Sequence, residues 1–223
     1  MSSAKTTNGH ARPFRVGVGG PVGSGKTALI EALVPMAIAQ GLSPLVITND
    51  IFTNLDAEHV RETLAGVLDP ERVIGVETGS CPHTAVRDDP TMNLAAMEEI
   101  TERFPDADLV FLESGGDNLT LSFSPALVDT YIFVIDVAQG DKIPRKKGPG
   151  VCRSDLLVIN KIDLAPYVRA DLDVMRRGAE ESRAGGGPYI MTDCLTGEGL
   201  PEVLAFIEQA GDLRGTWQGD PRA

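Results

Sequence analysis

The sequence predicts an α/β fold, a three-layer sandwich in which a mostly parallel central sheet lies between two layers of helices. Two observations predict it. Short, continuous runs of Val, Ile and Leu alternate with segments of helical periodicity, and a glycine-rich segment follows the first apolar run. Continuous apolar runs are typical of parallel strands buried on both faces, and the alternation predicts helical crossovers between them. The ligand site of such a sheet is expected at the carboxyl ends of its strands.

Each element has its own signal. The first strand is an apolar run before the glycines, and the helix after it carries Leu29, Leu33 and Met36 at helical spacing and stops at Gly41. Strands are predicted at Phe14–Val18, Leu45–Thr48, Val73–Val76, Leu109–Leu112, Tyr131–Asp136, Leu156–Asn160 and Tyr189–Met191. Helices are predicted at Thr27–Gln40, Ala57–Gly66, Leu94–Phe104, Asp171–Glu181 and Leu200–Gln209. Two segments rich in Gly and Pro, Gln139–Cys152 and Ala184–Pro188, are predicted as loops.

Length and composition limit the protein class. The chain of 223 residues predicts one domain, residues 14–210, between flexible tails at 1–13 and 211–223. A formal net charge of -12 argues against a nucleic-acid partner. Three widely spaced cysteines do not form a disulfide framework and favour a reducing compartment. Neither a signal peptide nor an apolar run of about 18 residues is present, so a cytoplasmic protein without a membrane partner is expected.

The glycine-rich segment has the pattern G-x-x-x-x-G-K-[ST] and reads Gly20-Pro21-Val22-Gly23-Ser24-Gly25-Lys26-Thr27. Its glycines allow a tight turn that points backbone N–H groups at phosphates. Lys26 would reach the β- and γ-phosphate oxygens, and the Thr27 hydroxyl is placed for Mg²⁺. Because the pattern lies between a predicted strand and a predicted helix, it indicates the phosphate-binding loop (P-loop) of a nucleoside triphosphatase.

A second motif indicates the base. Asn160, Lys161 and Asp163 form N-K-x-D at the end of a predicted strand. The Asp163 carboxylate can accept from two guanine N–H groups, which adenine does not offer. The Asn160 amide would bond the ring edge and the Lys161 stem would lie along its face. The motif therefore predicts GTP, against the alternative that these are polar residues capping a helix.

Acidic residues are expected at the same sheet edge. Glu113 and Gly116 follow a buried strand in the arrangement E-x-x-G, where GTPases commonly have D-x-x-G. Glu113 can orient Mg²⁺ or its water, and the Gly116 amide can meet the γ-phosphate. Asp50 and Glu77, each after a strand, are candidate Mg²⁺ ligands or loop caps. No glutamine follows Gly116 to orient water, which predicts slow intrinsic hydrolysis.

Cys81 and His83 flank Pro82 and offer one thiolate and one imidazole to a transition metal, Ni²⁺ or Zn²⁺. A complete site for either metal wants four ligands, and a two-fold dimer through this segment would supply two of each. The alternative is a buried cysteine beside a surface histidine.

Together, these motifs resemble the UreG family of urease accessory GTPases, a SIMIBI-class branch of the P-loop proteins. The resemblance runs from about Phe14 to Leu204, and the combination of Cys-Pro-His, E-S-G-G-D-N-L and G-D-K-I-P-R is specific to UreG-like proteins. The segments that carry it are Gly20–Thr27, Asn49–Thr53, Val76–Thr84, Arg87 with Asp89-Pro90, Glu113–Leu119, Gly140–Pro144, Gly148–Gly150, Arg153–Lys161 and Asp163–Val168.

The resemblance implies a GTPase that binds Mg²⁺, dimerises with GTP and holds one Ni²⁺ between two Cys-Pro-His segments. Hydrolysis would release nickel toward the urease active site. It also implies the accessory proteins UreF, UreD (also called UreH) and UreE, and apo-urease, as partners. Carried over residue by residue, Lys26 and Thr27 match the phosphate and Mg²⁺ positions, Asp50 the acid of the first switch, and Cys81 and His83 the nickel ligands.

The chain also departs from the family pattern. Leu55 stands where the family commonly has an acid, and the segment Thr192–Gly197 differs from the usual T-N-L-K-T-G. Other classes therefore stay open: a P-loop kinase, a nucleotide-binding assembly or metal-storage module with little turnover, and a hydrogenase-type nickel-insertion GTPase.

Overall fold

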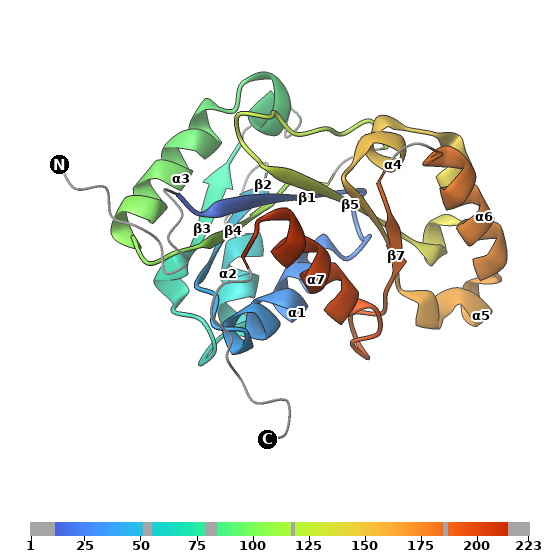
Figure 1. The fold of residues 1–223 in the computed structure, drawn as a ribbon, viewed down its shortest axis with the longest axis horizontal. Coiled ribbons are helices and arrows are strands. Elements are labelled where there is room, and N and C mark those ends of the chain that lie inside the picture. Colours follow the sequence, from blue (N-terminus) through green and yellow to red (C-terminus); the bar gives the residue numbers. More distant parts are fainter. Residues whose placement is uncertain (1–11, 51–54, 79–83, 117–118, 185–186, 214–223) are drawn as a thin grey trace.

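The protein is described by a computed structural model for residues 12–50, 55–78, 84–116, 119–184 and 187–213. Its centre is a seven-stranded sheet with the order β3-β2-β4-β1-β5-β6-β7, and every neighbouring pair of strands is parallel (Figure 1). The strands are β1 (Phe14–Gly19), β2 (Pro44–Asp50), β3 (Val73–Glu77), β4 (Leu109–Glu113), β5 (Thr130–Asp136), β6 (Leu156–Asn160) and β7 (Tyr189–Met191). The predicted fold class is confirmed.

Helices connect the strands as parallel pairing requires. The α-helices are α1 (Lys26–Ala39), α2 (Leu55–Thr63), α3 (Thr91–Arg103), α4 (Pro149–Arg153), α5 (Ala165–Val168), α6 (Leu172–Ser182) and α7 (Leu200–Ala210). Shorter helical turns are η1 (Pro70–Arg72), η2 (Thr84–Asp88), η3 (Val137–Gln139), η4 (Pro144–Lys146) and η5 (Ile162–Leu164). Among these described helices none is both long and apolar enough to cross a membrane.

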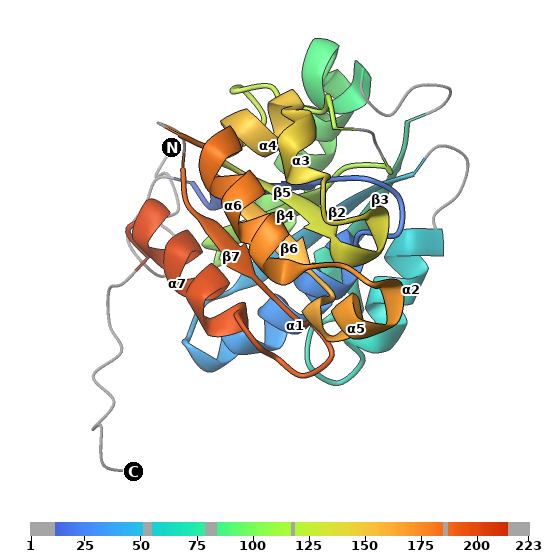
Figure 2. The ribbon, with the colours of Figure 1, turned by 90° about the vertical axis from the view of Figure 1, so that its right-hand side faces the viewer.

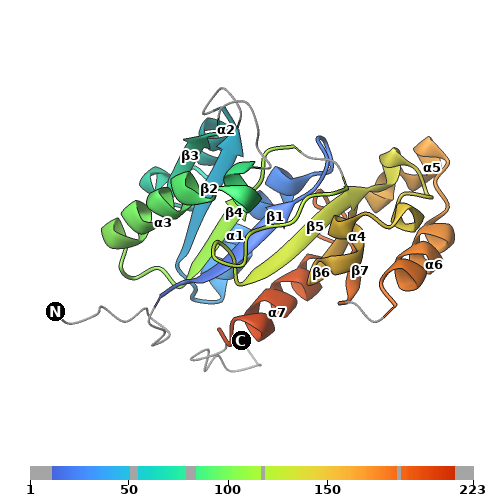
Figure 3. The ribbon, with the colours of Figure 1, turned by 90° about the horizontal axis from the view of Figure 1, so that it is seen from above.

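Two hydrophobic clusters, one on each face of the sheet, hold the layers together. Helices α1, α2 and α7 cover one face of the sheet, and α3, α4 and α6 cover the other (Figures 2 and 3). Their side chains pack against alternating strand residues on each face. The central strands are therefore buried on both faces, as in Phe111 of β4 and Phe133 of β5, which are completely buried. This burial explains the continuous apolar runs in the sequence.

The sequence predicts a loop at Gln139–Cys152. This prediction is wrong, because the segment contains the helical turn η4 and most of the helix α4. Pro144 and Pro149 suggest a loop, yet each occupies the first position of its helical turn, where a missing N–H costs nothing. Gly150 also suggests a loop, but a Cβ at this residue would lie 2.5 Å from the ring of Phe133. Its small size serves close packing of α4 on the sheet.

Candidate functional site

The predicted site residues meet at one edge of the sheet, where the strands end. Asp50 ends β2 and pairs in register with Glu77, which ends β3. Glu113 ends β4, and on the other side of β1 the last residues of β5 and β6, Asp136 and Asn160, pair in register. The P-loop follows β1 in the middle of this row. The order of the strands thus brings Asp50, Glu77 and Glu113 to one side of the P-loop and the N-K-x-D motif to the other.

The P-loop joins β1 to α1 through a backbone that only glycine adopts easily. Gly25 has φ 94° and precedes the first residue of α1, Lys26. Among the described residues no side chain caps the start of α1, and its first turn holds no acid. The N–H groups of the first turn and the positive end of the helix dipole therefore favour an anion at this place. Lys26 is 6% exposed, and its ammonium donates to the Pro21 carbonyl over 3.3 Å.

The N-K-x-D motif is attached directly to the P-loop. The Asn160 amide donates to the Ser24 carbonyl over 3.1 Å, and the Lys161 ammonium donates to the Gly23 carbonyl. The approach is so close that a Cβ on Gly25 would lie 2.3 Å from Asn160 Nδ2. The group predicted to read the base and the loop predicted to hold the phosphates therefore have a fixed separation.

The segment after β7 supports Asn160 from the other side. Thr192 Oγ1 donates to Asn160 Oδ1 over 3.1 Å, and Cys194 Sγ donates to the same oxygen over 3.2 Å. Burial raises the pKa of Cys194 to about 11, so the thiol stays protonated and keeps donating. Asp163 is exposed at the start of η5, where its carboxylate is accessible to a ligand.

Glu113 is a buried acid on the Mg²⁺ side of the predicted site. Thr27 Oγ1 donates to Glu113 Oε1 over 2.7 Å. Burial raises the pKa of Glu113 to about 7, although Lys26 and the bond from Thr27 act in the opposite direction. Its second oxygen, Oε2, is buried and has no hydrogen-bond partner within the described ranges. An unused carboxylate oxygen beside a threonine hydroxyl fits a hydrated Mg²⁺ ion, which takes oxygen ligands.

Asp56, at the start of α2, is a site residue that motif analysis missed. Burial and the neighbouring Asp50 raise its pKa, while Lys26 and His59 lower it, so this carboxylate lies close to both predicted site residues. Leu55, which stands where the family commonly has an acid, is 62% exposed. The only sequence signal for Asp56 is that an acid directly precedes a predicted helix, Ala57–Gly66.

Gly116 lies against the P-loop. A Cβ at this residue would be 2.1 Å from Cγ2 of Val22. The buried hydroxyls of Ser24 and Ser114 at this edge have no hydrogen-bond partner among the described residues. Buried polar groups without a partner are typical of a ligand-binding site.

The predicted nickel ligands Cys81 and His83 lie outside the described residues. Glu77, four residues before Cys81, is exposed at the end of β3. Within the described ranges no group of three or more His, Cys, Asp and Glu side chains could hold a metal ion.

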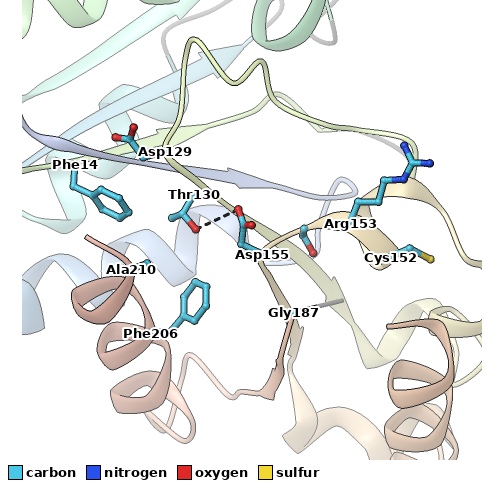
Figure 4. A pocket seen from close by; sticks show the side chains of 10 residues that line it. Phe14, Asp129, Thr130, Cys152, Arg153, Asp155, Gly187, Phe206 and Ala210 are labelled. Atoms are coloured by element: carbon cyan, nitrogen blue, oxygen red, sulfur yellow. Dashed lines mark hydrogen bonds between the residues drawn. The ribbon is translucent and has the colours of Figure 1, made fainter. Parts of the chain in front are cut away.

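A cavity of about 410 Å³ lies at the opposite, amino-terminal edge of the sheet (Figure 4). Phe14 from the start of β1 lines it together with Phe206 and Ala210 of α7, and Cys152 and Asp155 also reach it. None of its lining residues was predicted as a site residue. Cys152 is therefore separated by the length of the sheet from the edge that carries the motifs.

Comparison with known proteins identifies the family. The model of the CobW/HypB/UreG nucleotide-binding domain matches residues 14–186. Urease accessory protein UreG 2 of Streptomyces griseus is 66% identical over 195 residues, 87% of this chain and 86% of that protein. Urease accessory protein UreG of Yersinia enterocolitica is 60% identical over 205 residues, 92% of each chain. The chain belongs to the UreG branch of the CobW/HypB/UreG family. The resemblance indicated by the motifs is confirmed, and this UreG-family chain carries a nucleotide-binding domain.

Solved structures confirm the fold of this UreG-family chain. Hydrogenase maturation factor HypB of Archaeoglobus fulgidus aligns with a TM-score of 0.68 and 25% identity, over 89% of this chain and 90% of HypB. HypB of Helicobacter pylori, solved in complex with nickel, aligns with a TM-score of 0.71 and 17% identity, over 93% of this chain and 91% of HypB. The sheet that positions the motifs is thus shared with known nucleotide-binding proteins.

Proposed function

We propose that the protein is a GTP-hydrolysing nickel metallochaperone that dimerises with GTP and delivers Ni²⁺ to urease. The observation that carries the proposal is the attachment of the N-K-x-D motif to the P-loop in a chain of the UreG family. One frame then holds a guanine at Asp163 and a triphosphate at Gly20–Thr27.

The residues of the P-loop edge divide the work on GTP. Backbone N–H groups of the loop and the Lys26 ammonium bind the phosphates, and Asp163 selects guanine. Mg²⁺ would be held by Thr27 and Glu113, where it neutralises charge on the phosphate oxygens. Asp50 and Glu77, which end β2 and β3, would contact the ion through the water molecules that Mg²⁺ retains. The side chains of Thr27 and Glu113 are already hydrogen-bonded to each other, so the ion would replace this bond without moving either residue far.

Hydrolysis requires a positioned water. Asp56 is within electrostatic reach of both Asp50 and Lys26, and Asp50 is the acid that we assign to accept a proton from the water that attacks the γ-phosphate. The Gly116 amide would bind the same phosphate and report its loss. With no glutamine after Gly116, slow turnover without partners is expected.

Nickel is the cargo in this proposal. Cys81 and His83 of two chains supply four ligands, which suits Ni²⁺ and also Zn²⁺. The relatives named urease accessory protein UreG and the nickel-bound HypB of Helicobacter pylori support a role in nickel insertion. Partners in the cytoplasm would be UreF, UreD (UreH), UreE and apo-urease.

The decisive measurement determines the oligomeric state and the nickel content of the protein with nucleotide and both metal ions present. Light scattering after size-exclusion chromatography, with Mg²⁺, Ni²⁺ and a non-hydrolysable GTP analogue, is expected to give a dimer with one nickel ion per two chains. Cys81→Ala should lose at least 90% of that nickel and retain analogue binding. Cys152→Ala is the matched control, because Cys152 lies at the opposite edge of the sheet.

Two results would contradict the proposal. A wild-type chain that stays monomeric and free of nickel under these conditions is not a dimeric carrier. Equal loss of nickel in the Cys81 and Cys152 variants would place the ligands elsewhere.

A further inference from the structure

Two asparagines that belong to no predicted site form a buried pair between β2 and α3. Asn49 Nδ2 donates to Asn93 Oδ1 over 3.0 Å, and Asn93 Nδ2 donates back to Asn49 Oδ1 over 2.8 Å. Both residues are completely buried. Because burying two amides gives no hydrophobic gain, such a pair contributes a fixed geometry more than it contributes stability.

The second N–H of each amide bonds a backbone carbonyl. Asn49 Nδ2 donates to the carbonyl of Glu113 over 2.9 Å, and Asn93 Nδ2 donates to the carbonyl of Ala85 over 2.9 Å. A carbonyl accepts and never donates, so these outer bonds fix the orientation of both amides. The result is a continuous chain of hydrogen bonds from Glu113 through Asn49 and Asn93 to Ala85.

The two ends of this chain lie at functionally different places. Glu113 accepts the hydroxyl of Thr27, the residue predicted to hold Mg²⁺. Ala85 is two residues after His83, one of the predicted nickel ligands. The bonds thus connect the nucleotide edge with the end of the Cys-Pro-His motif.

The other side of the same motif is attached to the next residue of β2. Thr78 donates to the Asp50 carbonyl from its backbone N–H over 2.8 Å and from its hydroxyl over 3.0 Å. Residues 79–83 are therefore flanked by bonds to two consecutive residues of one strand, directly to Asp50 and through Asn93 to Asn49. A small shift at the end of β2 moves both attachment points together.

We propose that Asn49 and Asn93 are positioning residues that couple the nucleotide state to the placement of the nickel ligands. The inference rests on the proposed function and names how the two halves of that function communicate. When the γ-phosphate and Mg²⁺ engage Thr27 and Asp50, the end of β2 and the Glu113 carbonyl are held in one arrangement. The asparagine pair then holds Ala85, and with it the chain beyond His83, in the matching arrangement.

Amide hydrogen exchange tests the coupling without any nickel. In the wild-type chain, Mg²⁺ and a non-hydrolysable GTP analogue are expected to slow exchange in residues 84–89 at least five-fold. In Asn93→Ala the same residues should exchange faster and lose this response, while the amides at the start of α1 remain protected by the analogue. The affinity for the analogue should stay within about three-fold of wild type, since the side-chain hydrogen bonds of Asn93 go to Asn49 and Ala85 and not to the P-loop.

Two further variants separate positioning from simple destabilisation. Met97→Ala removes a completely buried side chain of α3 and leaves the asparagine pair intact, so it should keep the nucleotide response. The double variant Asn49→Ala/Asn93→Ala should reduce the exchange response of residues 84–89 no more than either single variant does, because the two residues act as one unit.

The outcomes distinguish this inference from the proposed function. If the wild-type chain shows no response to the analogue in residues 84–89, or if Asn93→Ala keeps it in full, the coupling is overturned whatever the chain does with nickel. If the response depends on Asn93 but nickel binding does not depend on Cys81, the coupling stands and the nickel proposal fails. Loss of the response in Met97→Ala would reduce Asn93 to a structural role.

Discussion

At the scale of single residues, Glu113 shows how burial prepares a carboxylate for a ligand. The folded protein holds one of its oxygens against Thr27 and leaves the other without a partner among the described residues. With the pKa of Glu113 raised to about 7, the nucleotide-free protein carries this residue partly protonated at neutral pH. Binding of Mg²⁺ beside it would favour the ionised form, so metal binding should release a fraction of a proton.

The raised pKa of Glu113 predicts how the free energy of unfolding depends on pH. Below pH 4.5 Glu113 is protonated in both the folded and the unfolded chain, and as the pH rises toward 7 the unfolded chain ionises first. The free energy of unfolding therefore falls across this window. Glu113→Gln, which cannot ionise, should gain about 2–3 kcal/mol relative to wild type between pH 5 and pH 8.

Urea unfolding of the nucleotide-free chain in a chelator measures this difference. Glu98→Gln, an exposed carboxylate on α3, serves as control and should change nothing beyond about 0.5 kcal/mol. A difference between wild type and Glu113→Gln that is independent of pH would show that the pKa of Glu113 is not raised.

The sequence could predict those site residues that motifs define. Asn160, Lys161 and Glu113 lie at the sheet edge where parallel strands were expected to bring them. Asp56 and Asn93 could not be predicted in the same way. Their proximity to the site comes from the packing of α2 and α3, and Asn93 is 44 residues from its partner. A single polar residue on a helix has no periodicity or spacing that identifies such a contact.

At the scale of elements, strands and long helices were predictable and short helices were not. A buried parallel strand produces a continuous apolar run, and α1 is long enough to show its period. By contrast, α4 has five residues and begins at a proline, so no periodic pattern distinguishes it from a loop. Its position is fixed instead by a distant residue, Arg183, which follows α6.

The second stability prediction concerns the guanidinium of Arg183. It is 5% exposed and donates to carbonyls of Val151 in α4, Ser154 before β6 and Gly187 before β7. A lysine retains the charge but not the planar fork, and leaves buried carbonyls without donors. Arg183→Lys should lower the free energy of unfolding by about 2–4 kcal/mol.

Arg177→Lys is the matched control, since Arg177 is exposed on α6, the helix that ends at Ser182. Urea unfolding of both variants measures the effect. If the two substitutions cost the same, the bonds made by Arg183 contribute nothing specific to the packing of α4.

At the scale of the whole molecule, charge governs self-association. Each chain has a formal net charge of -12, so the GTP-dependent dimer that we propose would bring two strongly acidic molecules together. Salt screens this repulsion over a Debye length of about 10 Å at 0.1 M. The dissociation constant of the dimer, measured by sedimentation with the GTP analogue, Mg²⁺ and Ni²⁺, should fall several-fold from 20 to 300 mM NaCl.

A dissociation constant that rises with NaCl would contradict this prediction. If salt weakens the dimer, ion pairs across the interface outweigh the net repulsion. Dilution of the nucleotide-free chain under the same conditions is the control for non-specific association.

The bonds from Asn160 and Lys161 to the P-loop hold the base-binding motif and the phosphate-binding loop at a fixed separation. Guanosine alone would contact only the motif, and inorganic triphosphate only the loop. A nucleotide that joins both parts is captured by its first contact at a high effective concentration for the second. The N-K-x-D motif and the P-loop are already in place relative to each other before the nucleotide binds, so binding costs less ordering entropy at these two segments.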